Sequence, residues 1–302
     1  MFELLTALWP LFALIVGGYC LRRIEFPSEA FWPGAERINY FVLFPALLFN
    51  SLATAPLNNP ALPRLALAVL LGLGLAWGGL LLVRRIQGWP AGRFGAFTQG
   101  ILRFNTYLGL AAVGSLFGQQ GLAVAALMLA LMVPAVNVLS VWALSAERGV
   151  SVRSLALPIL KNPLILACVL GTLYNLSDLP LPGGTDRLLG LLAAASLPLG
   201  LLCVGAALRP EQLGGEVSAL GANCCVRLLL MPGLAWAVAY VMQLPPMESI
   251  LLVLFFALPT APTAYVLTRQ LGGDSQLMAG IITLQTLLAA LSLPLLLGLL
   301  SG

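Results

Sequence analysis

The sequence predicts an all-α integral membrane protein, with ten transmembrane helices arranged as two inverted repeats of five. Hydrophobic residues make up 60% of the 302 residues and charged residues only 9%, and this composition excludes a soluble globular domain. Ten windows are apolar over the roughly 20 residues that a membrane-spanning helix needs. Three landmarks of the first half recur 153 positions later, on corresponding apolar segments: Pro10 and Pro163, Gly18 and Gly171, Pro45 and Pro198.

Each repeat holds five predicted spans. The first repeat, residues 1–147, contains the windows 3–22, 35–54, 65–86, 94–117 and 120–146, and the second, residues 154–302, contains 155–175, 187–208, 217–240, 248–270 and 276–300. Because five is an odd number, the second copy must enter the membrane in the opposite orientation, an arrangement typical of secondary transporters.

The distribution of basic residues predicts the orientation. Loops after the odd-numbered spans are flanked by Arg22, Arg23, Arg37, Arg84, Arg85, Arg93, Arg148, Arg153, Lys161, Arg209 and Arg269, whereas only Arg64 and Arg187 flank the alternate loops. Cytoplasmic loops retain Lys and Arg, so we expect both termini outside the cytoplasm in a multi-pass cell membrane protein. The pI near 9.0 then reflects membrane topology, and no nucleic-acid partner is expected.

The cysteines and the absence of histidine argue against a cofactor. All five cysteines fall within or at the ends of predicted spans, so they imply no disulfide framework. With no histidine and no Cys-x-x-Cys pair, a metal or haem site has no ligand set. We expect no cofactor and no metal.

Two spans carry polar or helix-breaking residues at mid-depth. Span 4 contains Arg103, Asn105 and Thr106, and span 9 contains Pro259 and Pro262. A proline inside a helix removes a backbone donor, and opened backbone persists in a membrane only when it is buried in protein or lines a cavity. The two breaks occupy equivalent places in the repeats, which predicts crossed broken helices 4 and 9 whose N-termini create a positive site for an anion.

The candidate ligand residues lie mainly at these breaks. Arg103 is the first candidate, because a charge at the bilayer centre costs roughly 2.5 to 3.5 kcal/mol and its fork fits a carboxylate; alternatively it pairs with carbonyls freed by the break. For Arg227 that structural alternative is favoured. The remaining candidates are Asn50, Asn105, Thr106, Tyr107, Asn137, Thr260, Pro262 and Thr263. Helix capping or interhelical hydrogen bonding would equally explain the asparagines and threonines.

The predicted function is alternating-access transport of small organic anions such as carboxylates. No Asp or Glu falls in the middle of a predicted span, because Glu3, Glu36 and Glu248 lie at span ends, and this disfavours coupling to Na⁺ or H⁺. An inside-negative potential drives an anion outward with about 2.3 kcal/mol per charge per 100 mV, so potential-driven uniport or efflux is the simplest mechanism. A sodium- or proton-coupled symporter is the alternative. An intramembrane sensor or enzyme is disfavoured, because a nucleophile would need a positioned base.

The motifs as a whole resemble the auxin efflux carrier family, whose bacterial members include malate and malonate permeases. The resemblance rests on Lys161-Asn162-Pro163-Leu164-Ile165, Leu197-Pro198-Leu199-Gly200-Leu201 with Gly205-Ala206, Ala261-Pro262-Thr263-Ala264 and Arg103-Phe104-Asn105-Thr106-Tyr107-Leu108-Gly109.

The resemblance implies the elevator-type fold shared with bile-acid symporters and sodium/proton antiporters. In that fold helices 1, 2, 6 and 7 form a scaffold, helices 3–5 and 8–10 form a moving transport domain, and the scaffolds form a homodimer in the lipid bilayer. The family's crossover asparagine and proline map onto Asn105 and Pro262. The long hydrophilic central loop of the plant carriers is absent, so auxin is not the expected substrate and a bacterial inner membrane is the expected location.

Overall fold

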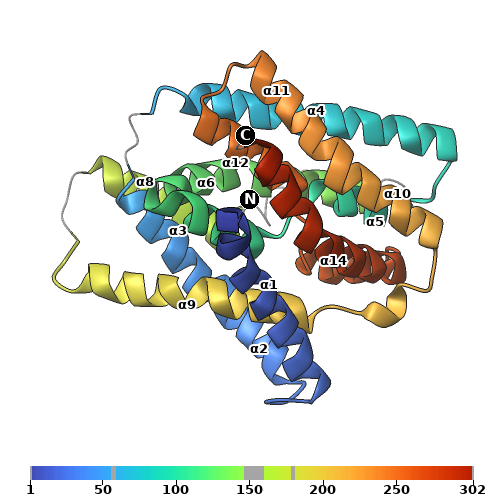
Figure 1. Cartoon of the computed structure of the whole chain (residues 1–302), viewed down its shortest axis with the longest axis horizontal. Coiled ribbons are helices and arrows are strands. Elements are labelled where there is room, and N and C mark those ends of the chain that lie inside the picture. The colour runs from blue at the N-terminus through green and yellow to red at the C-terminus, as the bar shows by residue number, and fades with distance from the viewer. Residues whose placement is uncertain (1, 56–58, 146–159, 178–180, 301–302) are drawn as a thin grey trace.

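The computed structural model describes residues 2–55, 59–145, 160–177 and 181–300, which fold into helices and connections without strands (Figure 1). The first half contains α1 (Phe2–Arg23), α2 (Phe31–Ile38), the π-helix η1 (Asn39–Leu43), α3 (Phe44–Ala53), α4 (Leu62–Gln87), α5 (Ala91–Leu102) and α6 (Thr106–Ser145). The second half contains α8 (Pro163–Leu176), α9 (Thr185–Ala206), the 3₁₀ turn η2 (Pro210–Gln212), α10 (Val217–Cys225), the π-helix η3 (Val226–Leu230), α11 (Met231–Val241), α12 (Pro246–Ala257), α13 (Thr263–Gln270) and α14 (Ser275–Leu300).

The length and apolarity of these helices support a multi-pass membrane protein. Within the described residues, five stretches are long and apolar enough to cross a bilayer: Leu62–Gln87, Ala91–Ser145, Thr185–Ala206, Val217–Val241 and Ser275–Leu300. The helices Pro163–Leu176 and Pro246–Ala257 are apolar but shorter. The predicted connection at 147–153 and the first part of the sixth predicted span lie outside the described residues.

Two π-helical turns precede prolines. The segment η1 is followed by Pro45 and the segment η3 by Pro232, each the second residue of the next α-helix. Proline has no N–H for the carbonyl four residues earlier, and a wider turn lets the helix continue past this defect. Each π-helix carries a buried polar residue, Asn39 and Arg227, which are 0% and 1% exposed.

Helix α6 consists of two arms that meet at Gly118. This residue has φ 56° and ψ −147°, a conformation that glycine adopts without a steric penalty. The bend separates the arm that begins at Thr106 from the arm that ends at Ser145. It coincides with the boundary predicted between the windows 94–117 and 120–146.

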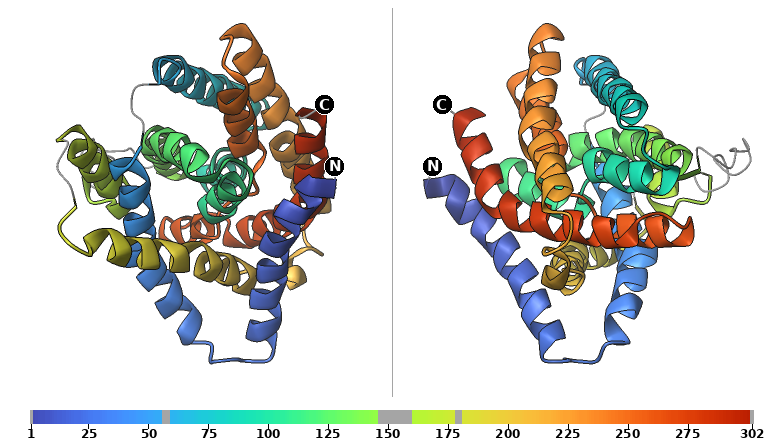
Figure 2. Two further views of the ribbon diagram at one scale, coloured as in Figure 1. Left: turned by 60° about the vertical axis from the view of Figure 1, so that its left-hand side comes forward. Right: turned by 90° about the vertical axis from the view of Figure 1, so that its right-hand side faces the viewer.

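The helices pack so that segments far apart in sequence become neighbours. Helix α1 packs along α9, α3 packs on α8 and α9, and α14 contacts α5 and α10. Gly18 and Gly205 allow the first of these contacts, since a Cβ at Gly18 would lie 2.8 Å from the Leu202 Cα. Both termini lie on the same side of the molecule, opposite the connection at residues 24–30 (Figure 2).

Two spans are interrupted where the sequence predicts breaks. Helix α5 ends at Leu102 and α6 begins at Thr106, with Arg103 in an extended backbone conformation. Helix α12 ends at Ala257 and α13 begins at Thr263. Four helix ends therefore lie inside the molecule, each with backbone groups that lack a partner within its own helix.

Candidate functional site

The two interruptions contact each other through Asn105. Its backbone N–H donates to the Pro259 carbonyl at 2.7 Å, which joins the break in the first half to the break in the second. Its side-chain Oδ1 accepts from the Leu108 N–H at 3.1 Å and so caps the start of α6. The Nδ2 amide is buried and donates to no acceptor among the described residues. Asn105 therefore caps a helix and keeps a free donor.

The sequence of the second break determines which carbonyls lose their helical donor. In an α-helix each carbonyl accepts from the N–H four residues later. For Phe255 and Leu258 these positions are Pro259 and Pro262, which have no N–H. For Ile101 of α5 the position is Asn105, whose N–H is bound to Pro259 instead. Three carbonyls thus need another donor.

Arg227 supplies all three donors. Its Nε donates to the Leu258 carbonyl at 2.6 Å, Nη1 to the Ile101 carbonyl at 2.6 Å, and Nη2 to the Phe255 carbonyl at 3.0 Å. One guanidinium therefore bonds the C-terminal ends of α5 and α12. The favoured interpretation from sequence, that Arg227 satisfies carbonyls in the packed bundle, is confirmed.

A second buried network holds another carbonyl of α5. The Gly100 carbonyl accepts from Gln285 Nε2 and from the Thr260 hydroxyl, each at 2.8 Å. Gln285 Oε1 in turn accepts from the Thr260 N–H at 2.8 Å, and Asn223 Oδ1 accepts from Gln285 Nε2. Thr260 is fully buried, and its polar groups are bound within the protein.

Sequence reasoning did not single out Asn223. Its Nδ2 donates to the Phe97 carbonyl at 2.9 Å. A detectable signal existed, because Asn223 precedes Arg227 by four residues and so shares its helix face. Two polar residues on one face of an apolar span indicate a buried polar contact.

Arg103 has a different environment from Arg227. The residue is half-buried, and its guanidinium donates to Asn137 Oδ1 at 3.0 Å and to the Thr263 hydroxyl at 3.3 Å. Both acceptors are neutral, and within the described residues no ion pair joins Arg103 to a carboxylate. Thr263 is the first residue of α13, so the positive guanidinium lies at the positive end of a helix.

Tyr107 packs away from Arg103, against α3 and α9. Its ring lies 5.0 Å from the Phe44 ring. A Cβ at Gly200 would lie 2.6 Å from the ring's Cγ. Only glycine therefore lets α9 approach Tyr107 this closely. The predicted residues thus fall into separate places, with Arg103, Asn137 and Thr263 together and Tyr107 at a helix contact.

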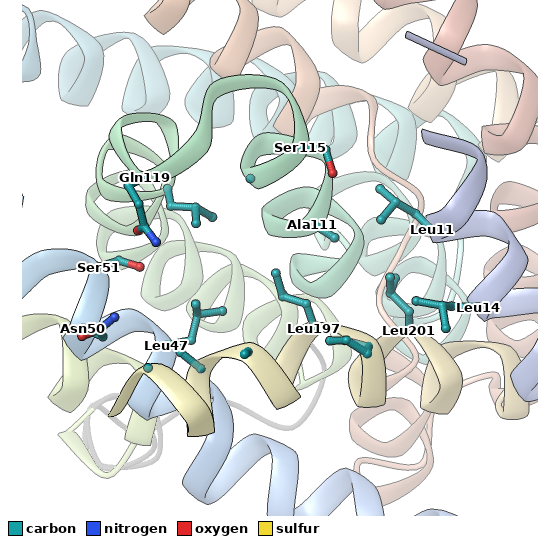
Figure 3. A pocket seen from close by; sticks show the side chains of 16 residues that line it. Leu11, Leu14, Leu47, Asn50, Ser51, Ala111, Ser115, Gln119, Leu197 and Leu201 are labelled. Atoms are coloured by element: carbon teal, nitrogen blue, oxygen red, sulfur yellow. The ribbon is translucent and has the colours of Figure 1, made fainter. Parts of the chain in front are cut away.

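A first cavity, of about 430 Å³, lies between α6 and the helices α1, α3 and α9 (Figure 3). Asn50, Ser51 and Gln119 gather at one end of it, whereas Leu11 and Leu201 line the other. Asn50 is therefore a cavity residue, and Arg103 is not part of this lining. The cavity presents uncharged polar groups beside an apolar wall.

A second cavity, of about 250 Å³, lies further along α1 and α9. It is lined by Arg22 of α1, Glu36 of α2 and Cys203 of α9, and it reaches Pro262 beside α13. Along both α1 and α9, the residues that line the first cavity precede those that line the second. The contact between Tyr107 and Gly200 lies beside the first cavity, because Gly200 falls between its lining residues Pro198 and Leu201.

Comparisons with known proteins identify the family and a relative. The family model described as "Membrane transport protein" matches residues 3–297. An "Uncharacterized transporter" of Methanothermobacter thermautotrophicus (strain ATCC 29096 / DSM 1053 / JCM 10044 / NBRC 100330 / Delta H) is 27% identical over 287 residues, covering 93% of each chain.

Proposed function

The chain belongs to the membrane transport protein family, that of the auxin efflux carriers, and on this premise we propose that it is a secondary transporter of small organic anions such as carboxylates. The observation that carries the proposal is the environment of Arg103. Arg103 is half-buried, and within the described residues the side chains that its guanidinium binds, Asn137 and Thr263, are neutral, so it retains its charge for a ligand. A carboxylate is the planar partner that a guanidinium fork binds in a bidentate manner.

The helix ends around Arg103 add to its charge. Each helix N-terminus contributes roughly half a positive charge, and α6 and α13 both begin at the breaks. With Arg103, the region holds roughly two positive charges, enough to offset a monocarboxylate or a dicarboxylate. Thr106 and Thr263 are the first residues of these helices and are half-buried, so we assign them to ligand orientation.

Asn105 and Pro262 complete the proposed site. The buried Nδ2 of Asn105 has no acceptor in the described protein, and such a group is costly unless a ligand or water satisfies it. Pro262 precedes Thr263 and lines the second cavity, so it connects the Arg103 region to that cavity. Thr260 and Tyr107 have other partners, and we assign them support of the broken backbone and of the helix contact.

The two cavities support alternating access. We assign α1, α2, α3, α8 and α9 to a scaffold, corresponding to predicted helices 1, 2, 6 and 7, and α4–α6 and α10–α14 to a transport domain. The first cavity reaches the first arm of α6, and the second reaches α13. An elevator movement of the transport domain past α9 would open one cavity while closing the other. The division into repeats 1–147 and 154–302 and a homodimer through the scaffold belong to the same proposal.

Potential-driven uniport is the proposed mode of transport, and a sodium- or proton-coupled symport is the alternative. In the described residues the acidic side chains that line the second cavity are Glu29, before α2, and Glu36, in the second turn of α2. Neither is a hydrogen-bond partner of Arg103. An imposed Na⁺ or proton gradient that concentrates the anion in proteoliposomes would favour the symporter. An intramembrane enzyme or sensor would show no solute flux through purified protein.

The test of the site is Arg103→Gln, which keeps hydrogen-bonding capacity but removes the charge. In proteoliposomes loaded with a dicarboxylate, we expect counterflow to fall at least tenfold, while the apparent unfolding temperature in detergent stays close to that of the wild type. The matched control is Arg269→Gln, an exposed arginine at the last turn of α13, which should transport normally. Wild-type counterflow by Arg103→Gln would reject the assigned role.

A further inference from the structure

Arg227 is not among the residues assigned to the substrate site. It is 1% exposed and is the largest fully buried side chain among the described residues. Its three hydrogen bonds go to backbone carbonyls of Ile101, Phe255 and Leu258, and none goes to a side chain. A buried charge is costly unless it is compensated, so the compensation must come from these carbonyls.

The helix ends provide this compensation. A helix C-terminus carries roughly half a negative charge, and the guanidinium bonds the C-terminal ends of both α5 and α12. Two such ends amount to roughly one negative charge, which matches one guanidinium. The carbonyls converge in the manner of oxygen ligands around a monovalent cation, a use that unwound carbonyls and half-helix C-termini serve in other transporters.

We propose that Arg227 is a tethered counter-cation, a positioning residue that fills a carbonyl cage at the crossing of the two broken helices in place of a bound metal cation. The inference rests on the proposed transport function and deepens it by assigning a cause for transport without Na⁺ or K⁺. The guanidinium is covalently attached, so the site is occupied in every conformation. It also joins α5 to α12, so that the two breaks move as one unit.

The cage forms because two prolines and the bond from Asn105 remove the helical donors of specific carbonyls. Pro259 and Pro262 remove the donors for Phe255 and Leu258, and the bond from Asn105 to Pro259 removes the donor for Ile101. Only a group with several donors in a fixed planar arrangement reaches all three acceptors. Arginine has that arrangement, whereas the lysine ammonium is a compact point charge without a planar fork of donors.

The experiment is chemical rescue of Arg227→Ala. This variant lacks the atoms of an N-ethylguanidinium ion, so the ion fits the space that the truncation leaves. In purified protein we expect a lowered apparent unfolding temperature that millimolar N-ethylguanidinium raises in a saturable manner. Tetramethylammonium, which has the same charge but no N–H donor, should have no effect. Arg269→Ala, which truncates an exposed arginine, is the control variant, and it should show no such response.

Transport supplies the second measurement. In proteoliposomes the wild type should transport equally in Na⁺, K⁺ or N-methylglucamine buffers, whereas Arg227→Ala should lose at least tenfold in rate and recover with N-ethylguanidinium. If Arg227→Ala does not fold, Arg227→Lys serves instead. The lysine cannot reach the three carbonyls at once, so we expect its stability to be below that of the wild type. In transport we expect a lower maximal rate and an unchanged KM for the anion.

Three results would overturn the proposal: wild-type stability of Arg227→Ala or Arg227→Lys without additive, equal rescue by tetramethylammonium, or dependence of the wild type on Na⁺. The unfolding measurement does not involve the substrate. Rescue of stability in a protein that moves no anion would therefore reject the transport function and retain the cage. Anion transport without any rescue of stability would reject the cage alone.

Discussion

Replacing Gly200 with alanine should hinder transport more than it destabilises the fold. In the described conformation the new Cβ would lie 2.6 Å from Tyr107 Cγ, 2.7 Å from Tyr107 Cδ1 and 2.8 Å from Asn39 Nδ2. Ordinary contacts of a Cβ begin near 3.4 Å, so at least one neighbour must move. Tyr107 cannot easily withdraw, because its ring rests on Phe44.

The magnitude follows from the cost of overpacking. Inserting a methyl group into a well-packed contact costs about 1–3 kcal/mol, and about 1.4 kcal/mol corresponds to a tenfold change in an equilibrium. The gain of up to about 1 kcal/mol from replacing glycine in a helix applies to every conformation and therefore cancels. If α6 slides past α9, the clash exists in the described conformation only, and the population of that conformation should fall roughly 5- to 150-fold.

The assay combines counterflow with accessibility labelling. A reporter, Ser115→Cys, lies in the lining of the first cavity, and the exposed Cys20 and Cys225 are replaced by serine in the background. Gly200→Ala should slow labelling of the reporter and slow counterflow. Equal labelling and transport rates in Gly200→Ala and in the control Gly190→Ala, whose Cβ would meet nothing within 4 Å, would refute a sliding contact at Tyr107.

Two further predictions concern stability. Gly18→Ala places a Cβ 2.8 Å from the Leu202 Cα, and it should lower the free energy of unfolding by about 1–3 kcal/mol, measured by thermal unfolding. The control Gly17→Ala places its Cβ 3.8 Å from the Leu202 Cδ2 and should leave the stability unchanged. Equal losses of stability in the two variants would contradict this prediction. The Arg93 guanidinium, which donates to Glu216 Oε1 at 2.7 Å, lowers the pKa of that carboxyl. The pair's stabilisation is therefore present above the ordinary pKa and is lost as the pH falls through the lowered one. Because exposed pairs contribute only about 0–1 kcal/mol, Glu216→Gln should lower stability at pH 7 by no more than that amount and should have no effect at a pH below the lowered pKa.

The interruptions could be predicted from sequence because their causes are local. Pro259 and Pro262 remove backbone donors wherever they occur in a helix, and a charged residue such as Arg103 at mid-depth needs a special environment. Both breaks were placed within a few residues of their observed positions. The bend at Gly118 likewise follows from a break between two apolar windows.

The partners across the breaks could not be predicted, because they depend on how distant helices pack. Nothing in the sequence indicates that Arg227 meets Ile101, or that Gln285 meets Gly100. Thr260 was expected at a ligand site on the basis of its depth, but its environment is decided by Gln285 of α14. The assignment of Thr260 to a ligand stays untested, and its present bonds favour a supporting role.

The two membrane-embedded arginines differ because helix ends differ in sign. Arg227 meets C-terminal carbonyls, whose partial negative charge cancels its own, so it can be fully buried without a carboxylate. Arg103 meets the beginning of α13, where the helix adds positive charge. The same side chain is therefore neutralised in one place and left in excess in the other. A positive excess inside a membrane is costly in the empty protein, and a bound anion would relieve that cost, which is the physical basis for assigning the site to an anion.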